Sequence, residues 1–195
     1  MLLKNIFDYI LALILLFFLV GLIVLLVIIS SFDTNQFGVF TQKRVGKNGK
    51  FFTIYKIRTI KGFSENTITT DQHHITKFGK ILRDYKLDEL PQLINILKGE
   101  MSFVGPRPDV KGYADVLVGE DRIMLQVKPG LTGPAQLKYR HEEELLSDVT
   151  NPKAYNDEVL WPDKVKINVD YVKNWSFKQD LIYMVQTLIK NKRES

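Results

Sequence analysis

The sequence contains no cysteine, which excludes disulfide bonds and thiolate metal sites and gives no sign of an oxidising compartment. Internal repeats and low-complexity tracts are also absent, and 195 residues suffice for one domain of ordinary size. Charge is missing from Tyr9 to Phe32, a run long enough to cross the roughly 30 Å hydrocarbon core of a bilayer as a helix. The composition therefore predicts a small protein that meets the membrane near its N-terminus.

Residues 1–32 allow several interpretations. A cleaved signal peptide would have an apolar core of about 7 to 15 residues and a small-residue cleavage site, which Ser30, Ser31 and Phe32 match poorly. A single span and a re-entrant helix both remain. Because positive residues prefer the cytoplasm, the rest of the chain is predicted on that side. The cations that follow the run are Lys43, Arg44, Lys47 and Lys50.

The net charge of +5 is unevenly distributed along the chain. Residues 43–86 carry eleven Lys or Arg against three acids, whereas residues 142–163 carry seven acids against one lysine. A basic block beside a membrane segment favours binding to anionic lipid, to nucleic acid or to a phosphorylated substrate. A solvated basic surface without a ligand is the alternative.

Two short β-type runs follow the apolar segment, separated by Gly46, Asn48 and Gly49. These turn residues predict a β-hairpin. If residues 51–59 are extended, side chains alternate between the two faces of the strand. One face would then carry two cations together, since it comprises Phe52, Ile54, Lys56 and Arg58.

Residues 61–74 are predicted to form a polar loop. Its last two residues, His73 and His74, would point apart and lack a third ligand at metal-site spacing, so no metal site is predicted there. Residues 75–87 are predicted to form an amphipathic helix. Its inward face is expected to hold Ile75, Phe78, Ile81 and Leu82, and its outward face Lys77, Lys80 and Arg83.

The C-terminal half gives coarser predictions. Residues 110–127 are expected to form a helix and then a second helix or a strand, residues 128–136 a turn, and residues 142–158 a surface helix and loop. Residues 176–195 predict a helix that either packs into the core or lies in the membrane interface. Its apolar face comprises Phe177, Leu181, Met184, Val185, Leu188 and Ile189, and Lys190, Lys192 and Arg193 follow.

Adjacent acids, Asp88 and Glu89, precede an apolar stripe with helical spacing. Pro91 is tolerated only in the first turn of a helix, and Gly99 can end one, so both acids are predicted at a helix N-terminus. Helix capping is one interpretation, with a gain of about 0.5 to 2 kcal/mol. The stripe consists of Leu90, Leu93, Ile94 and Leu97.

The other interpretation is chemical. A carboxylate at a helix N-terminus among Lys and Arg is expected to have a lowered pKa, which suits a nucleophile or a metal ligand. Asp88 would attack phosphorus once cations neutralise the phosphoryl oxygens. Lys56 and Arg58 share a strand face, and Arg107 is held between two prolines. Glu89 would hold a magnesium ion that bridges the same phosphates.

Several long motifs occur in a fixed order over nearly the whole chain: FTQKRVGKNGKFFTIYKIRT, ITKFGKILRDYKLDELPQLINILKGEMSFVGPRPDV, KPGLTGPAQ and YVKNWSFKQDL. Together with the N-terminal apolar segment, they make the chain similar to the bacterial sugar transferases of the monotopic phosphoglycosyl transferase superfamily. Agreement over motifs of this length is far more specific than one short pattern.

The resemblance implies transfer of a sugar 1-phosphate from a UDP-sugar to undecaprenyl or another polyprenyl phosphate. UMP is released, as the first membrane step of capsule, exopolysaccharide, O-antigen or glycoprotein assembly. The family's acid dyad falls on Asp88, which forms a covalent phosphosugar, and on Glu89, which helps to bind Mg²⁺. The implied location is the bacterial inner (cytoplasmic) membrane. Basic positions for phosphate contact or loop stabilisation fall on Lys56, Arg58, Arg83 and Arg107, with surface pairing as the alternative for Arg83.

The chain departs from the family pattern at two places. Val20 and Gly21 stand where familiar members have a Ser-Pro pair that breaks the apolar helix, and glycine weakens a helix by only about 1 kcal/mol relative to alanine. We favour the re-entrant form over a straight span. Asn168 stands where some members have an aspartate, and Asp170 is not a safe substitute.

The expected fold class is α/β, mostly helical with a small β-hairpin or sheet and a membrane-inserted helix. Residues 1–32 are expected to form the membrane segment, and residues 33–195 a cytoplasmic catalytic domain with interfacial amphipathic helices. Expected partners are UDP-sugar, undecaprenyl phosphate, membrane lipid and Mg²⁺, without nucleic acid and with a homodimer left open. A membrane-tethered basic adaptor and a polyprenyl-phosphate hydrolase are the competing functions.

Overall fold

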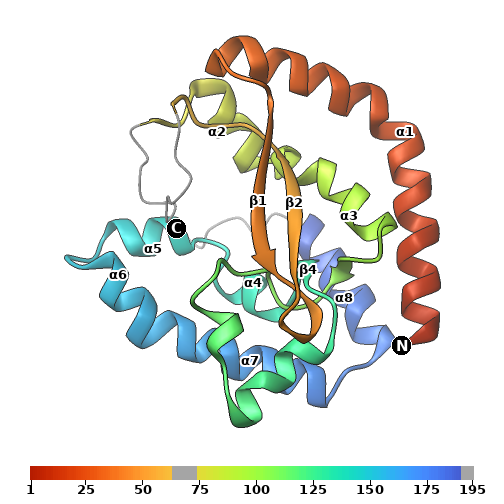
Figure 1. The fold of residues 1–195 in the computed structure, drawn as a ribbon, viewed down its shortest axis with the longest axis vertical. Helices are drawn as coiled ribbons and strands as arrows, with labels where there is room; N and C mark the ends of the chain where they lie inside the picture. Colours follow the sequence, from red (N-terminus) through yellow and green to blue (C-terminus); the bar gives the residue numbers. More distant parts are fainter. Residues whose placement is uncertain (63–73, 190–195) are drawn as a thin grey trace. The chain divides into compact units, whose positions relative to one another are not determined.

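The computed structural model describes residues 1–62 and 74–189. Helices dominate, and the strands form two small two-stranded sheets, as the α/β prediction expects (Figure 1). Contacts divide the chain into two compact units. The first is Met1–Arg44 with Phe52–Met101, and the second is Val45–Phe51 with Ser102–Ser195. The division into a membrane segment and a catalytic domain stays a prediction.

Some predicted features lie outside the described residues. These are most of the predicted polar loop, including His73, and the cations Lys190, Lys192 and Arg193.

Helix α1 (Leu2–Thr34) opens the first unit and is long and apolar enough to cross a membrane. Many of its large apolar side chains are exposed, with Phe17 and Phe18 at 77% and 74%. A surface of this kind suits lipid better than water. Asn35 adopts a left-handed conformation and ends the helix slightly beyond the predicted boundary at residue 32.

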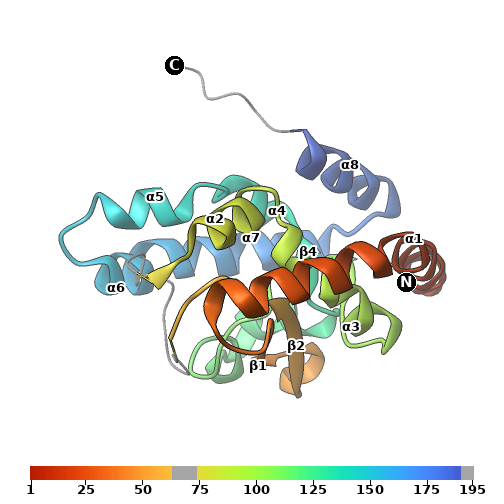
Figure 2. The ribbon, with the colours of Figure 1, turned by 90° about the horizontal axis from the view of Figure 1, so that it is seen from above.

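Helix α1 bends partway along, so that its two halves run in different directions (Figures 1 and 2). It contains no proline, and Gly21 is its only glycine. A methyl group at Gly21 would meet no atom within 4 Å, so space does not demand glycine there. The low helix propensity of glycine is the sequence feature that makes bending less costly.

Strands β1 (Val39–Val45) and β2 (Phe51–Ile57) form the predicted hairpin. The turn between them is the 3₁₀ segment η1 (Lys47–Gly49), in which Asn48 has a φ of 59° and Gly49 a φ of 77°. Such angles favour asparagine and glycine, which explains why these residues predict the turn correctly. Arg58 lies just beyond the end of β2.

Helix α2 (Lys77–Asp84) begins where Thr76 Oγ1 accepts a hydrogen bond of 2.8 Å from the backbone of Gly79. Leu82 is fully buried and packs in a cluster with Leu26 of α1. The predicted inward position of Ile81 is wrong, because its side chain is 52% exposed. Leu82 lies in the core, and Phe78, which is partly buried, packs against the same cluster as predicted.

The stretch predicted as one helix after Lys86 consists of two. A 3₁₀ helix, η3 (Leu87–Gln92), precedes the helix α3 (Leu93–Leu97), and Gly99, with a φ of 75°, follows its end as predicted. Ile94 is exposed and Ile96 is buried, so the predicted stripe is wrong at Ile94. The change from 3.0 to 3.6 residues per turn rotates the buried face.

In the second unit, strands β3 (Ser102–Val104) and β4 (Gly130–Thr132) form a parallel pair that the sequence did not predict. Each strand has three residues, and β4 lies in a segment rich in glycine and proline that resembles a turn. Strand periodicity needs a longer run to be recognised.

In this strand pair, the backbone of the segment GPRP approaches the backbone of the segment KPGLTGPAQ closely. Gly130 N donates a 2.8 Å hydrogen bond to Pro106 O. A Cβ on Gly130 would collide with Gly105 N, and one on Gly133 would lie 2.5 Å from Gly105 O. The contact excludes side chains and fixes the turn that presents Arg107.

Replacing Gly130 with alanine is therefore expected to lower the free energy of unfolding by about 1 to 3 kcal/mol, because two backbones must separate to admit the methyl group. A denaturant titration of the purified protein measures this change. A free energy of unfolding equal to that of the wild type would show that the close approach is not required.

The remaining second unit is mostly helical around an apolar core. The two successive helices predicted within residues 110–127 are present as 3₁₀ helices, and the helix and loop predicted at residues 142–158 are confirmed in outline. The core comprises Val45, Ala114, Met124, Leu125, Val165 and Val169. The elements are η4 (Ala114–Val116), η5 (Gly119–Gln126), α4 (Pro134–Lys138), α5 (Glu142–Ser147), α6 (Pro152–Tyr155), the π-helical turn η6 (Asn156–Leu160), α7 (Trp161–Lys173) and α8 (Phe177–Leu188).

The apolar face of α8 is largely exposed, with Val185 at 55% and Leu188 at 85%. The buried residue of this helix is Asp180, which accepts hydrogen bonds from Tyr171 Oη (2.7 Å) and Trp175 Nε1 (2.9 Å). The interpretation of α8 as a core helix is therefore wrong, and its place in a membrane interface stays a prediction.

Candidate active site

Asp88 and Glu89 lie side by side in the first turn of η3, at a helix N-terminus as predicted. Lys86 has a φ of 57°, which turns the chain sharply between α2 and η3. Asp88 is only 7% exposed, and Glu89 is half-buried. Burial of adjacent acids is costly unless a cation lies close, so helix capping alone does not account for this arrangement.

Lys56 supplies that cation from strand β2. Its Nζ lies 2.9 Å from Glu89 Oε1 and 3.9 Å from Asp88 Oδ2. The three side chains are between 10% and 19% exposed, so the contact is poorly screened by solvent. The structure therefore brings together three of the predicted site residues.

The predicted lowering of the Asp88 pKa is wrong. Burial raises the pKa of this carboxyl above its ordinary value, and the charge of Glu89 acts in the same direction. Lys56, Lys86 and Arg83 oppose this rise but do not outweigh the loss of hydration. The sequence shows the surrounding cations but not the depth of burial, which is why it suggests the opposite direction.

Arg83 lies in the last turn of α2, and its charge acts on Asp88. Its Nε donates a hydrogen bond of 3.0 Å to Thr59 Oγ1, and Thr59 is only 6% exposed. This half-buried contact differs from loose surface pairing. A contact between Arg83 and a substrate phosphate stays a prediction.

Arg58 lies at the junction of α1 and β1. Its Nε donates to Phe37 O (2.9 Å), and its guanidinium stands 5.7 Å from the centre of the Phe40 ring. Its carbonyl accepts a hydrogen bond of 2.6 Å from Ser30 Oγ of α1. Arg58 therefore connects the end of the apolar helix to the hairpin. The prediction that Arg58 and Lys56 lie on one face of a strand did not indicate this role.

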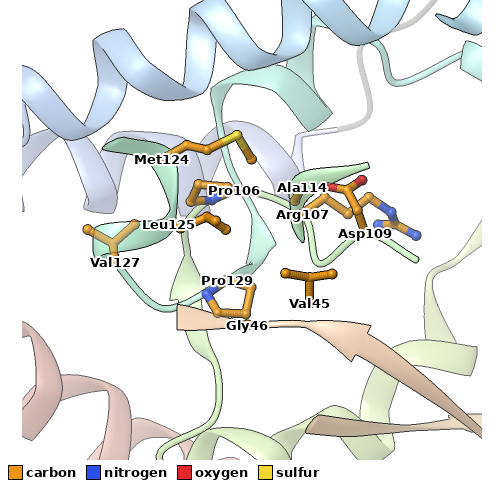
Figure 3. A pocket seen from close by; sticks show the side chains of 10 residues that line it. All are labelled: Val45, Gly46, Pro106, Arg107, Asp109, Ala114, Met124, Leu125, Val127 and Pro129. Carbon is orange, nitrogen blue, oxygen red and sulfur yellow. The ribbon is translucent and has the colours of Figure 1, made fainter. Parts of the chain in front are cut away.

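Arg107 belongs to the second unit, so its predicted role beside the acid pair stays a prediction. Figure 3 shows its side chain near that of Asp109, at one side of a small hollow. Met124, Leu125 and Val127 lie at the other side.

The family model for bacterial sugar transferases matches residues 1–193. The chain belongs to the bacterial sugar transferase family. The resemblance inferred from the motifs is thereby confirmed, and a catalytic function replaces the alternative of a membrane-tethered adaptor.

Curated relatives of this sugar transferase match most of its length. The uncharacterized sugar transferase EpsL of Bacillus subtilis (strain 168) is 34% identical over 192 residues, which cover 97% of this chain and 87% of that protein. A UDP-glucose:undecaprenyl-phosphate glucose-1-phosphate transferase of Caulobacter vibrioides is 30% identical over 193 residues, with 95% and 68% covered. The Escherichia coli (strain K12) protein of the same name is 32% identical over 160 residues, which cover 78% of this chain and 32% of that longer protein.

The acid pair of this sugar transferase suits a magnesium ion that is shared with a substrate. Among residues 1–62 and 74–189, no group of three or more His, Asp or Glu side chains gathers to hold a metal. Magnesium usually keeps several waters and binds one or two carboxylates together with substrate phosphates. Asp88 and Glu89 fit this requirement, and they do not fit a metal cage made of protein alone.

Two buried amides were not assigned roles from the sequence. Asn168 of α7 is 4% exposed, and among the described residues its Oδ1 has no hydrogen-bond partner. Asp170, two positions on, is exposed and bonded to Asn174, so it does not replace an acid at position 168. Asn95 of α3 is fully buried between β2 and Glu100. The signal that could have identified it is a polar residue between two apolar neighbours, Ile94 and Ile96.

Proposed function

We propose that this sugar transferase moves a sugar 1-phosphate from a UDP-sugar to undecaprenyl phosphate and releases UMP. The names of the Caulobacter and Escherichia relatives support this reaction class. Within the chain, the observation that carries the proposal is the buried acid pair held against Lys56. A desolvated carboxylate beside a cation is suited to attack an anionic phosphoryl group.

In the proposed first step, an Asp88 carboxylate oxygen forms a bond to the β-phosphorus of the UDP-sugar. The bond between this phosphorus and the oxygen that bridges to the α-phosphate breaks, and that oxygen leaves with UMP. Burial of Asp88 removes much of the hydration that would shield its oxygens, and Lys56 lies close enough to offset charge. The sugar phosphate remains as an acyl phosphate on Asp88.

In the second step, a phosphate oxygen of undecaprenyl phosphate attacks the same phosphorus. The bond from phosphorus to the Asp88 oxygen breaks, which restores the carboxylate and leaves undecaprenyl diphosphate sugar. Glu89, with Asp88, would hold a magnesium ion, whose charge helps to neutralise phosphate oxygens. Lys56 and Arg83 are proposed to contact the remaining phosphate charge, and the phosphate contact of Arg107 stays a separate prediction.

The lipid acceptor explains why a small enzyme carries a long apolar helix. We place α1 in the inner membrane as a re-entrant helix, with the rest of the chain on the cytoplasmic side. The bend in α1 supports re-entry, and the cations that follow α1 support that side. Holding the site at the membrane surface raises the effective concentration of the acceptor phosphate.

A panel of UDP-sugars tests the proposal. Purified protein is incubated with each donor and Mg²⁺, with and without undecaprenyl phosphate, and UMP and the intact protein mass are measured. One donor is expected to give repeated turnover only with the acceptor, and to add the mass of its sugar phosphate to the protein when the acceptor is omitted. Release of phosphate from undecaprenyl phosphate without any UDP-sugar would indicate a polyprenyl-phosphate hydrolase, and no UMP from any donor would contradict the proposal.

A further inference from the structure

Asn95 is fully buried, yet its side-chain amide is engaged on every side. Its Nδ2 donates to Thr53 O (2.7 Å) and to Glu100 Oε2 (2.7 Å), and its Oδ1 accepts from Tyr55 N (3.3 Å). The residue thus uses both donor hydrogens and one acceptor site. A buried amide whose nitrogen and oxygen are both hydrogen-bonded costs little and fixes the groups that it joins.

The two strand groups bonded by Asn95 lie on the edge of β2 that faces away from β1. Arg58 N donates to Gly38 O, so the even-numbered residues of β2 direct their backbone groups towards β1. Thr53 and Tyr55, with odd numbers, present theirs at the opposite edge. The amide of Asn95 bonds this edge as the N–H and C=O of one residue in a neighbouring parallel strand would, and so replaces a missing strand.

This contact fixes the distance between the two segments that make the acid site. Lys56 directly follows Tyr55, and α3, which carries Asn95, directly follows the 3₁₀ helix of Asp88 and Glu89. A shift of β2 along α3 would change the separation between Lys56 Nζ and the carboxylates. The separations of 2.9 Å and 3.9 Å therefore depend on a hydrogen-bonded register set by Asn95.

We propose that Asn95 is a positioning residue that holds Lys56 against the acid pair by serving as a surrogate strand for β2. The inference deepens the proposed function and rests on it for its kinetic readout. Asn95 does not touch the reacting atoms. Its effect on turnover passes through Lys56.

The test compares Asn95→Asp with Asn95→Ala. Aspartate keeps the acceptor for Tyr55 but puts a second oxygen against Thr53 O and Glu100, which drives β2 from α3. Alanine removes the hydrogen bonds of Asn95 without adding repulsion. The alanine variant therefore remains informative if Asn95→Asp fails to fold. Both are expected to reduce kcat for UMP release, by up to about 100-fold for a displacement near 1 Å, and to change KM little.

A double-mutant comparison separates positioning from loss of stability. If Asn95 acts through Lys56, Asn95→Ala should lower kcat in the wild type but have little further effect in a Lys56→Met background. Ile96→Val, at the adjacent buried position, should lower the melting temperature but leave kcat nearly unchanged. Glu100→Gln keeps an acceptor for Asn95 and should also keep kcat close to that of the wild type.

A second readout needs no substrate. The separation of Lys56 Nζ from Glu89 Oε1, 2.9 Å here, is measured in crystal structures of the wild type and of the Asn95 variants. A longer separation in the variants supports the positioning role even if no donor yields UMP, in which case the proposed function alone fails. An unchanged separation, or an equal loss of kcat from Asn95→Ala with and without Lys56, would overturn the inference.

Discussion

Asp88→Asn is expected to abolish UMP release, by a factor of at least about 10³, while membrane association stays unchanged. The amide has no negative oxygen with which to bond to phosphorus, so neither half-reaction has a covalent route. The proposed membrane association uses the exposed apolar surface of α1, which the substitution does not touch. UMP release, the intact protein mass after incubation with the donor, and sedimentation with vesicles measure the three outcomes.

The same variant is expected to be as stable as wild type or more stable at neutral pH. Burial raises the pKa of Asp88 in the folded protein above that of the unfolded chain. Between these two pKa values the folded state binds more protons, so stability decreases as pH rises through this window. Asparagine does not ionise and avoids this loss. The melting temperature of the variant relative to wild type should therefore increase with pH and then level off above the folded pKa.

Asp84→Asn is the matched control, because Asp84 is an exposed acid at the end of α2. It should change UMP release less than about twofold, as is usual for surface substitutions remote from a site. Retained turnover in Asp88→Asn would remove Asp88 from the nucleophile role. Lost turnover together with a large fall in melting temperature would indicate misfolding instead.

Local sequence chemistry predicted the elements of the first unit well and their burial less well. Asn48 and Gly49 indicate the hairpin turn because their left-handed angles exclude most other residues. Ile81 and Ile94 were placed inward by helical spacing, but both are exposed. The spacing of apolar residues shows that a helix has an apolar face. How many residues of that face are buried depends on neighbouring elements that are distant in the sequence.

The candidate site shows the same limit. Adjacent acids and a strand lysine were sufficient to predict Asp88, Glu89 and Lys56 as a group, and the structure brings these side chains together. The direction of the Asp88 pKa shift depended on burial, which no motif displays. The contact of Asn95 with the edge of β2 joins residues about forty positions apart in the sequence, so no local pattern reveals it. Arg58 was predicted to share a strand face with Lys56, but its side chain instead donates a hydrogen bond to the backbone carbonyl of Phe37.

Lys56→Met is expected to lower kcat for UMP release by about 10² to 10³-fold, the usual effect of removing one preorganised electrostatic partner. Methionine keeps much of the apolar stem but leaves two buried carboxylates without their close cation. The pKa of Asp88, which Lys56 lowers, must then rise further. A reaction that needs ionised Asp88 should therefore lose activity at a higher pH than wild type as the solution is acidified.

Lys77→Met, which removes an exposed cation from α2, should keep the wild-type profile. An acidic limb that stays in place in Lys56→Met would show that Lys56 does not control the ionisation of Asp88, whatever the loss in rate.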